Sequence, residues 1–536
     1  MTGDSPTALT ARDLPHPSRG EWWAAFVLAA LLTAMVGALA VQGNAVNWKA
    51  LAALSHAQDV LRQEGRVNLA LIGFVEPPLP GLLQIPLAWV APGLVRTGDA
   101  AWVLGALVAG LTIAALNAIC AGVGVGRPAR WVLCAIALLN PVYLGMASTG
   151  SPDALYLLLL LGAAWAILRW QRDGTLRDLI AASLLLSLAP LTRYDAVAPI
   201  AAATIVVAAQ TLASGRSWAR LEGTVITFLL PIVYIAGLWV LANGVILGDP
   251  WHFWRVAWQP NGAAGAGSTS PWQGVLGAVV VFAPLPAALW WAIWGGAADR
   301  PRLALGAAAI LLSPALAVLA FPGAFALWQE HATQANLPFL PIPELFAPLL
   351  AAGWFLSACA LGDIPALFAR KSLTKEACLA GSAALLAFGC LLVMGPEERV
   401  YLDFRPAIAG KPFGADDATD TKRVAEKLRL AAPRRLVIAG WPGYAVTLYA
   451  DRVANKVLLV STQPPAEPVA GRPASALLVR DGKTLARDAS ARWQWARVLG
   501  APLPTAPAWV LDGWAYYPTK PKPSSHSTRP TRGGAR

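Results

Sequence analysis

Long apolar segments occupy most of this 536-residue chain. A run of about 20 apolar residues is long enough to cross the roughly 30 Å hydrocarbon core of a membrane as one helix. Only 13% of the residues are charged, against about 25% in soluble domains. The sequence predicts a polytopic α-helical membrane protein with about 11 transmembrane helices, at about residues 21–43, 100–123, 131–147, 153–169, 178–192, 195–211, 223–246, 275–296, 303–321, 343–361 and 377–394.

Basic residues are concentrated in every second connection between these segments. Cytoplasmic loops retain positive charge, so the alternation predicts which loops face the cytoplasm. By this rule the tail 1–20 is cytoplasmic, whereas the short connections that hold Arg193 and Arg255 are extracytoplasmic. The formal charge of +12 is explained by the basic loops and tails, so nucleic-acid binding is not predicted. The basic loops contain Arg127, Arg130, Arg169, Arg172, Arg177, Arg216, Arg220, Arg300, Arg302, Arg370, Lys371 and Lys375.

The transmembrane domain is predicted over 21–396, with a long first extracytoplasmic loop over 44–98. Within this loop, 48–65 has apolar and polar residues at helical spacing, which predicts an amphipathic helix on the membrane surface. The stretch 78–93 is apolar but short and interrupted by prolines. We interpret it as an interfacial segment, because a crossing there would move the arginine-rich loops outside.

The composition changes after about residue 396. The pattern predicts a small extracytoplasmic α/β domain over 397–518, in which strands and helices alternate around a parallel sheet. The tail 519–536 has almost no apolar residues and is expected to be disordered. The predicted elements of the domain are a helix at 421–430 and strands at 435–440, 456–460 and 476–479.

Two carboxylates on the predicted outer side are candidates for chemistry, because ionisable groups near the hydrocarbon are costly and often functional. Glu76 lies in a stiff, proline-containing turn, and Asp153 follows Ser151 and Pro152. Each has a plainer interpretation. Asp153 or Ser151 would cap a helix, and Glu76 would be an ordinary interfacial carboxylate.

Arg193 is the third candidate, because an arginine between two apolar segments needs an anionic partner. That partner is either Asp195, in a structural pair, or a phosphate, whose geometry matches the guanidinium fork. The sequence leaves both open.

Aromatic and histidine residues suggest further substrate contacts. Trp254 and Arg255 belong to a tryptophan-rich loop that could stack on sugar rings, although tryptophan is also common at every membrane interface. His331 follows Glu330 and could bind a metal, but the pair has no further ligand at suitable spacing. No metal site is therefore assigned.

The chain resembles the GT-C class of integral-membrane glycosyltransferases, which includes protein O-mannosyltransferases and lipid A aminoarabinose transferases. The segment 76–79 (Glu-Pro-Pro-Leu) is similar to the Glu-Lys-Pro-Pro-Leu motif of that class, and 191–195 (Leu-Thr-Arg-Tyr-Asp) is similar to its Leu-Thr-Arg/Lys segment. Asp153, which opens a helix after an outer loop, and 337–341 before a later helix also look like features of the class.

The resemblance implies a transferase that moves a sugar from a polyprenyl-phosphate donor to a lipid, glycan or protein acceptor on the outer face of a bacterial inner membrane. It implies Glu76 or Asp153 as the catalytic base and Arg193 as the phosphate anchor. Asp195, Trp254, Arg255 and His331 complete the predicted substrate-binding set. No cofactor is indicated. Members of this class differ in their need for a divalent metal ion, and the sequence shows no clear ligand set.

The chain also departs from the class. Relatives place an acid soon after the first helix, whereas this chain has none from 44 until Asp59. An ungapped match places Glu76 at the lysine of the motif and Val75 at its glutamate. A non-catalytic protein that binds lipid-linked glycan or assists envelope assembly is therefore the alternative. A transporter is less well supported, because no two related halves are visible.

Overall fold

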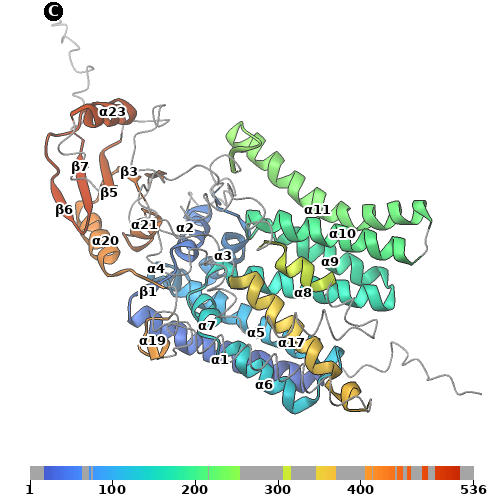
Figure 1. Ribbon diagram of the computed structural model, residues 1–536. Coiled ribbons are helices and arrows are strands. Elements are labelled where there is room, and N and C mark those ends of the chain that lie inside the picture. Colours follow the sequence, from blue (N-terminus) through green and yellow to red (C-terminus); the bar gives the residue numbers. More distant parts are fainter. Residues whose placement is uncertain are drawn as a thin grey trace, which may run out of the picture. The chain divides into compact units, whose positions relative to one another are not determined.

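The computed structural model describes residues 17–62, 72–73, 76–214, 217–253, 306–314, 346–369, 405–412, 415–440, 443–450, 455–459, 474–480 and 489–519. The chain forms two compact units, one of residues 1–95 with 99–416 and one of 96–98 with 417–536. The first unit is helical, and the second is built around a β-sheet (Figure 1).

The first unit is a bundle of helices joined by short connections. Its long helix α5 packs against both α1 and α8, and α11 packs against both α9 and α10 (Figure 1). The elements are α1 (Arg19–Gln42), β1 (Ala45–Val46), α2 (Trp48–Arg62), α3 (Leu79–Val90), α4 (Pro92–Thr97, which ends in the second unit), α5 (Asp99–Gly122), α6 (Arg127–Leu138), α7 (Pro141–Ser148), α8 (Pro152–Asp173), α9 (Leu176–Leu188), η2 (Tyr194–Ala196), α10 (Val197–Ala213), α11 (Trp218–Leu247), α17 (Phe346–Ala369) and α19 (Arg405–Ile408).

Several of these helices are long and apolar enough to cross a membrane. Among the described residues there are five by length and composition, namely α1, α5, α8, the continuous η2–α10 and α11, and six if the bent pair α6–α7 counts as one span. The chain is thus a multi-pass membrane protein. The predicted segments at 275–296 and 377–394 lie outside the described residues, so the total of eleven stays a prediction.

The single helix predicted over 131–147 is wrong. The chain instead bends by 64° between α6 and α7. The Asn140 side chain accepts hydrogen bonds from the backbone N–H groups of Val142 and Tyr143, at 3.1 and 3.2 Å, and so caps α7. Pro141 follows at the first position of α7, where its missing N–H costs nothing. The Asn-Pro pair inside this apolar run therefore breaks the helix.

The arginine-rich connections meet at one end of the bundle. Glu21, in the first turn of α1, pairs with Arg127 at 2.5 Å and with Arg130 at 3.2 Å. Arg169, near the end of α8, pairs with Asp178 at the start of α9, at 3.2 Å. These contacts join the ends that the charge pattern predicts to be cytoplasmic.

The helix α2 is largely enclosed by protein. The amphipathic pattern predicted that it lies on the membrane surface, but the polar Ser55 and Gln58 are buried along with its apolar residues. The following helix α3 packs directly against it, and Gly81 of α3 lies beside the Ala53 carbonyl. Both sides of α2 are therefore occupied, which a single-face pattern cannot indicate.

Glycines allow α1, α5 and α7 to approach closely. A Cβ atom on Gly105 of α5 would lie 1.9 Å from the Ala147 carbonyl oxygen, and one on Gly37 of α1 would lie 2.6 Å from the Trp102 Cβ. Small residues at helix contacts are a common device in membrane bundles, since they bring backbones into van der Waals contact.

The second unit contains a five-stranded sheet with strand order β4-β3-β5-β7-β6. The strands β3 (Arg435–Ala439), β4 (Asn455–Leu459) and β5 (Ala476–Arg480) are parallel and begin within a residue of their predicted positions. The strands β6 (Trp509–Leu511) and β7 (Trp514–Pro518) add an antiparallel edge that the sequence analysis missed. The remaining elements of this part are β2 (Asp416–Asp417), at the unit boundary, and the helices α20 (Thr419–Ala431), α21 (Gly443–Ala450) and α23 (Ala489–Leu499).

Both faces of this sheet are covered. Val424 and Leu428 of α20 pack with Val446 of α21 against one face. Trp495 and Val498 of α23 pack against the other face. Alternate residues of β3 are therefore buried on opposite sides, which explains why all four residues after Arg435 are apolar.

We expect Gly105→Ala to destabilise the bundle by about 1–3 kcal/mol, because the new methyl group collides with backbone rather than with a movable side chain. Gly223→Ala on α11 is the control, since a Cβ atom there meets nothing within 4 Å. Removing this helical glycine should leave stability unchanged or raise it by up to about 1 kcal/mol. Thermal unfolding in detergent measures both, and equal melting temperatures would contradict the close packing of α5 with α7.

Candidate functional site

Asp153 stands in the first turn of α8, held by its neighbour Ser151. The Ser151 hydroxyl accepts a hydrogen bond from the Asp153 backbone N–H at 3.2 Å and donates to the Asp153 carboxylate at 2.9 Å. Ser151 is thus the helix cap, one of the two residues considered for that role. The Asp153 carboxylate is left to interact with another part of the chain.

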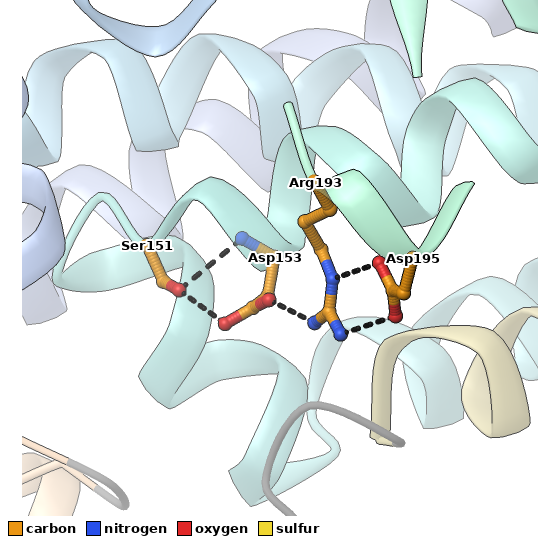
Figure 2. Close-up of polar contacts among 4 residues, drawn as sticks. All are labelled: Ser151, Asp153, Arg193 and Asp195. Atoms are coloured by element: carbon orange, nitrogen blue, oxygen red, sulfur yellow. Dashed lines mark hydrogen bonds and ion pairs between the residues drawn. The ribbon is translucent and has the colours of Figure 1, made fainter. Parts of the chain in front are cut away.

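That other part is Arg193, in the turn between α9 and η2 (Figure 2). Its Nε and Nη2 atoms donate to the two carboxylate oxygens of Asp195, at 3.0 and 2.7 Å. Its Nη1 atom donates to Asp153. The guanidinium also lies 4.9 Å from the ring centre of Tyr156, one helical turn after Asp153. The pair with Asp195, one of the two alternatives that the sequence left open, is present, and a second carboxylate from α8 joins it.

The cluster is nearly buried and carries a net negative charge. The side chains of Arg193, Asp153 and Asp195 are 9%, 13% and 16% exposed. Two carboxylates around one guanidinium give these three side chains a formal charge of −1, which the nearby Lys49 ammonium offsets. Removing one partner from a buried ionic cluster typically costs about 3–5 kcal/mol, because a charge is left without its counter-ion. The cluster therefore fixes α8 against the turn that precedes α10.

Three of the five guanidinium N–H hydrogens of Arg193 are used by these carboxylates. Two hydrogens, one on each terminal nitrogen, are not assigned to them. Arg193 can therefore hold its structural partners and still donate to an additional anion.

Glu76 reaches the same region through the backbone. The N–H of Leu79 donates to the carbonyl of Leu191 at 2.8 Å, which joins the Glu76 loop to the turn that carries Arg193. The Glu76 carboxylate also interacts electrostatically with Tyr194. The structure thus places Glu76 in the same part of the bundle as Asp153 and Arg193.

The surroundings of Glu76 make its carboxyl group a stronger proton acceptor. Burial raises the pKa of Glu76 to about 7, and the nearby Lys49 ammonium partly opposes this effect. A carboxyl group with such a pKa exchanges a proton readily near neutral pH.

Two charged groups of this region were missed by the sequence analysis. Lys49 is exposed in the first turn of α2 and interacts electrostatically with Glu76, Asp153 and Asp416. The Asp416 carboxylate accepts a hydrogen bond from the Trp48 backbone N–H, and burial raises its pKa to about 6. Asp416 follows the predicted spans by many residues, so no local pattern indicates that it returns to α2.

The remaining predicted contacts, Trp254, Arg255 and His331, lie outside the described residues. Phe253 is the last described residue before Trp254 and Arg255. The centre of its ring lies 5.2 Å from that of Tyr194, the residue after Arg193. The tryptophan-rich loop therefore begins next to the cluster. Within the described part of the chain, no three His, Cys, Asp or Glu side chains converge in a way that could hold a metal ion.

We expect Glu76 to make stability depend on pH. Folding raises its pKa from 4.5 to about 7, so the folded state holds this proton more tightly than the unfolded chain does. The resulting stabilisation is present at low pH and is lost as the pH rises from about 4.5 to about 7. It amounts to at most about 3 kcal/mol. In Glu76→Gln the melting temperature should depend less on pH between about 4.5 and 7. The same pH dependence in the variant and the wild type would contradict the burial of the carboxylate.

Comparison with known proteins identifies the fold. No protein-family model matches the chain, and no curated protein matches its sequence significantly. The crystal structure of ArnT from Cupriavidus metallidurans bound to undecaprenyl phosphate is similar, with a TM-score of 0.56, 15% identity, and coverage of 94% of this chain and 98% of that chain. The apo ArnT structure matches with a TM-score of 0.46 and 14% identity, over 94% of this chain and 98% of that one. The arabinofuranosyltransferase AftD from Mycobacteria matches with a TM-score of 0.43 and 15% identity, over 95% of this chain and 40% of that one.

The similarity to undecaprenyl-phosphate-bound ArnT extends over nearly the whole of both chains, so it concerns the complete architecture and not one helical bundle. The GT-C fold predicted by the resemblance in sequence is thereby confirmed. At 15% identity the likeness establishes the fold and assigns no roles to individual residues.

Proposed function

We propose that the chain is a membrane glycosyltransferase that transfers a sugar from a polyprenyl-phosphate donor to an envelope acceptor on the extracytoplasmic face of the bacterial inner membrane. The observation that carries this proposal is the convergence of Glu76, Asp153 and Arg193 at the end of the bundle opposite the arginine-rich connections. The GT-C fold, and the undecaprenyl phosphate bound by ArnT, support the class of donor.

Glu76 is the better candidate for the catalytic base. A base works best when its pKa lies near the pH of the reaction, and that of Glu76 is about 7. The negative charge of Asp153 is already compensated by Arg193 and by the Ser151 hydroxyl, so Asp153 is the weaker proton acceptor. We assign Asp153 to the positioning of Arg193.

Arg193 and Lys49 supply positive charge for the leaving phosphate. The two unassigned N–H hydrogens of Arg193 suit phosphate oxygens. The Lys49 ammonium lies in electrostatic range of both Glu76 and Asp153. Their positive charge stabilises the negative charge that develops on the phosphate as its bond to the sugar breaks.

The reaction then follows from these positions. The acceptor hydroxyl oxygen attacks the anomeric carbon of the sugar, and its proton passes to Glu76. The bond between the anomeric carbon and the phosphate oxygen breaks, and its electrons remain on the polyprenyl phosphate. The products are the glycosylated acceptor and polyprenyl phosphate, so no nucleotide and no redox partner is required.

A lipid-glycan-binding protein without transferase activity is the second candidate. It is favoured by the absence of an acid between residue 44 and Asp59, where relatives have one. In that case the ionic cluster would bind the phosphate of a lipid-linked sugar, and no proton acceptor would be needed.

Transfer assays should distinguish the glycosyltransferase from the lipid-glycan-binding protein. Purified protein is incubated with radiolabelled polyprenyl-phosphate sugars and extracted envelope acceptors. We expect transfer by the wild type, a loss of at least about 100-fold in Glu76→Gln, because general-base catalysis contributes about 10²–10⁴-fold, and weaker polyprenyl-phosphate binding in Arg193→Lys.

Asp173→Asn is the matched control, because Asp173 is a carboxylate paired with Arg172 at the opposite end of α8. It should retain transfer. Binding without transfer in the wild type, across the donors tested, would favour the binding protein. Full activity in Glu76→Gln would remove Glu76 from the reaction.

A further inference from the structure

Tyr156 contacts the cluster, and its hydroxyl group has no role in the proposed reaction. It lies on α8, three residues after Asp153, and its side chain is fully buried. Its ring forms the surface on which the Arg193 guanidinium rests, at 4.9 Å. The guanidinium is thereby fixed on one face by this ring and at its edges by Asp195 and Asp153.

The hydroxyl group of Tyr156 has no hydrogen-bond partner among the described residues. It lies within electrostatic range of both Asp195 and Asp153. Buried hydroxyl groups are nearly always hydrogen-bonded, because an unmade bond costs about 1–3 kcal/mol. A buried donor without a partner, in electrostatic range of two carboxylates, indicates a second arrangement in which one of them accepts its hydrogen bond.

The contacts of Arg193 indicate how that arrangement arises. Asp195 holds the guanidinium through two parallel hydrogen bonds and is only two residues away in the same turn. Asp153 holds it through one bond and belongs to another helix. A phosphate that first engages the two unassigned hydrogens and then replaces a carboxylate on the guanidinium would therefore displace Asp153 more easily than Asp195. The displaced carboxylate would keep its bond to Ser151 but would need a new donor for its other oxygen.

We propose that Tyr156 is a positioning residue whose hydroxyl donates to Asp153 when the donor phosphate takes the place of that carboxylate on Arg193. This inference rests on the proposed function. In the exchanged state Arg193 holds Asp195 and the phosphate, and Asp153 accepts from Ser151 and Tyr156. Every polar group of the cluster then has a partner, whereas in the present arrangement the Tyr156 hydroxyl has none.

Tyr156→Phe tests this directly, because it removes the hydroxyl and keeps the ring beneath Arg193. In detergent without ligand, the melting temperature should stay the same or rise, since no bond is lost. Binding of polyprenyl phosphate, measured by a melting-temperature titration, should weaken by roughly 10- to 100-fold, the effect of losing a hydrogen bond to a charged group. Tyr143→Phe, which removes another buried hydroxyl in the same bundle, should bind as the wild type does.

A double-mutant cycle with Asp153→Ala shows whether the hydroxyl acts through Asp153. Tyr156→Phe should weaken binding in the wild type and have no further effect once the carboxylate is absent. Equal binding by wild type and Tyr156→Phe, or an equal loss in both backgrounds, would overturn the inference while leaving the proposed function intact. Failure of the wild type itself to bind polyprenyl phosphate would instead refute the donor class, and with it the inference.

Discussion

The burial of charge in an apolar bundle is the constraint on which this structure depends. Asp153, Arg193 and Asp195 lie where the helices meet and are at most 16% exposed. Isolated charges could not remain in such surroundings, because each would lose several kcal/mol of hydration. They remain as a group, and the geometry that compensates them also brings α8 to the turn before α10. The position of the candidate site and the packing of the bundle therefore have the same cause.

This arrangement separates the roles of the two candidate carboxylates. Both are near the same ammonium group, yet only Asp153 has a guanidinium in direct contact. Paired carboxylates hold their charge and orient their partners. Glu76 is partly buried and has no such contact among the described residues, and its pKa of about 7 lets it take up a proton near neutrality. Two carboxylates thus have different roles, because their surroundings differ.

The sequence was informative where length, apolarity and charge decide the outcome. The spans α1, α5, α8 and α11 lie close to their predicted ranges, because long apolar runs have few alternatives. Sidedness, derived from the arginine pattern, predicted Glu76, Asp153 and Arg193 on one side of the membrane, and the structure places their segments in one part of the bundle. Asp195 was one of two partners considered for Arg193, and nothing in the sequence indicated that Asp153 would share the same guanidinium. The Asn140-Pro141 pair indicates the break between α6 and α7, but the prediction of one helix over 131–147 did not take it into account. The burial of α2 and the return of Asp416 to Trp48 were not readable, since both depend on what a distant segment covers.

One main-chain contact has a wider consequence. The hydrogen bond from the Leu79 amide to the Leu191 carbonyl sets the spacing of two loops without using any side chain. Such a bond is kept whatever residues stand at these positions, proline at 79 excepted. The loops could accordingly diverge in side-chain chemistry, and so in the molecules they recognise, while the backbone framework between them stays the same. Low sequence identity alongside a retained architecture is what a scaffold of this kind permits.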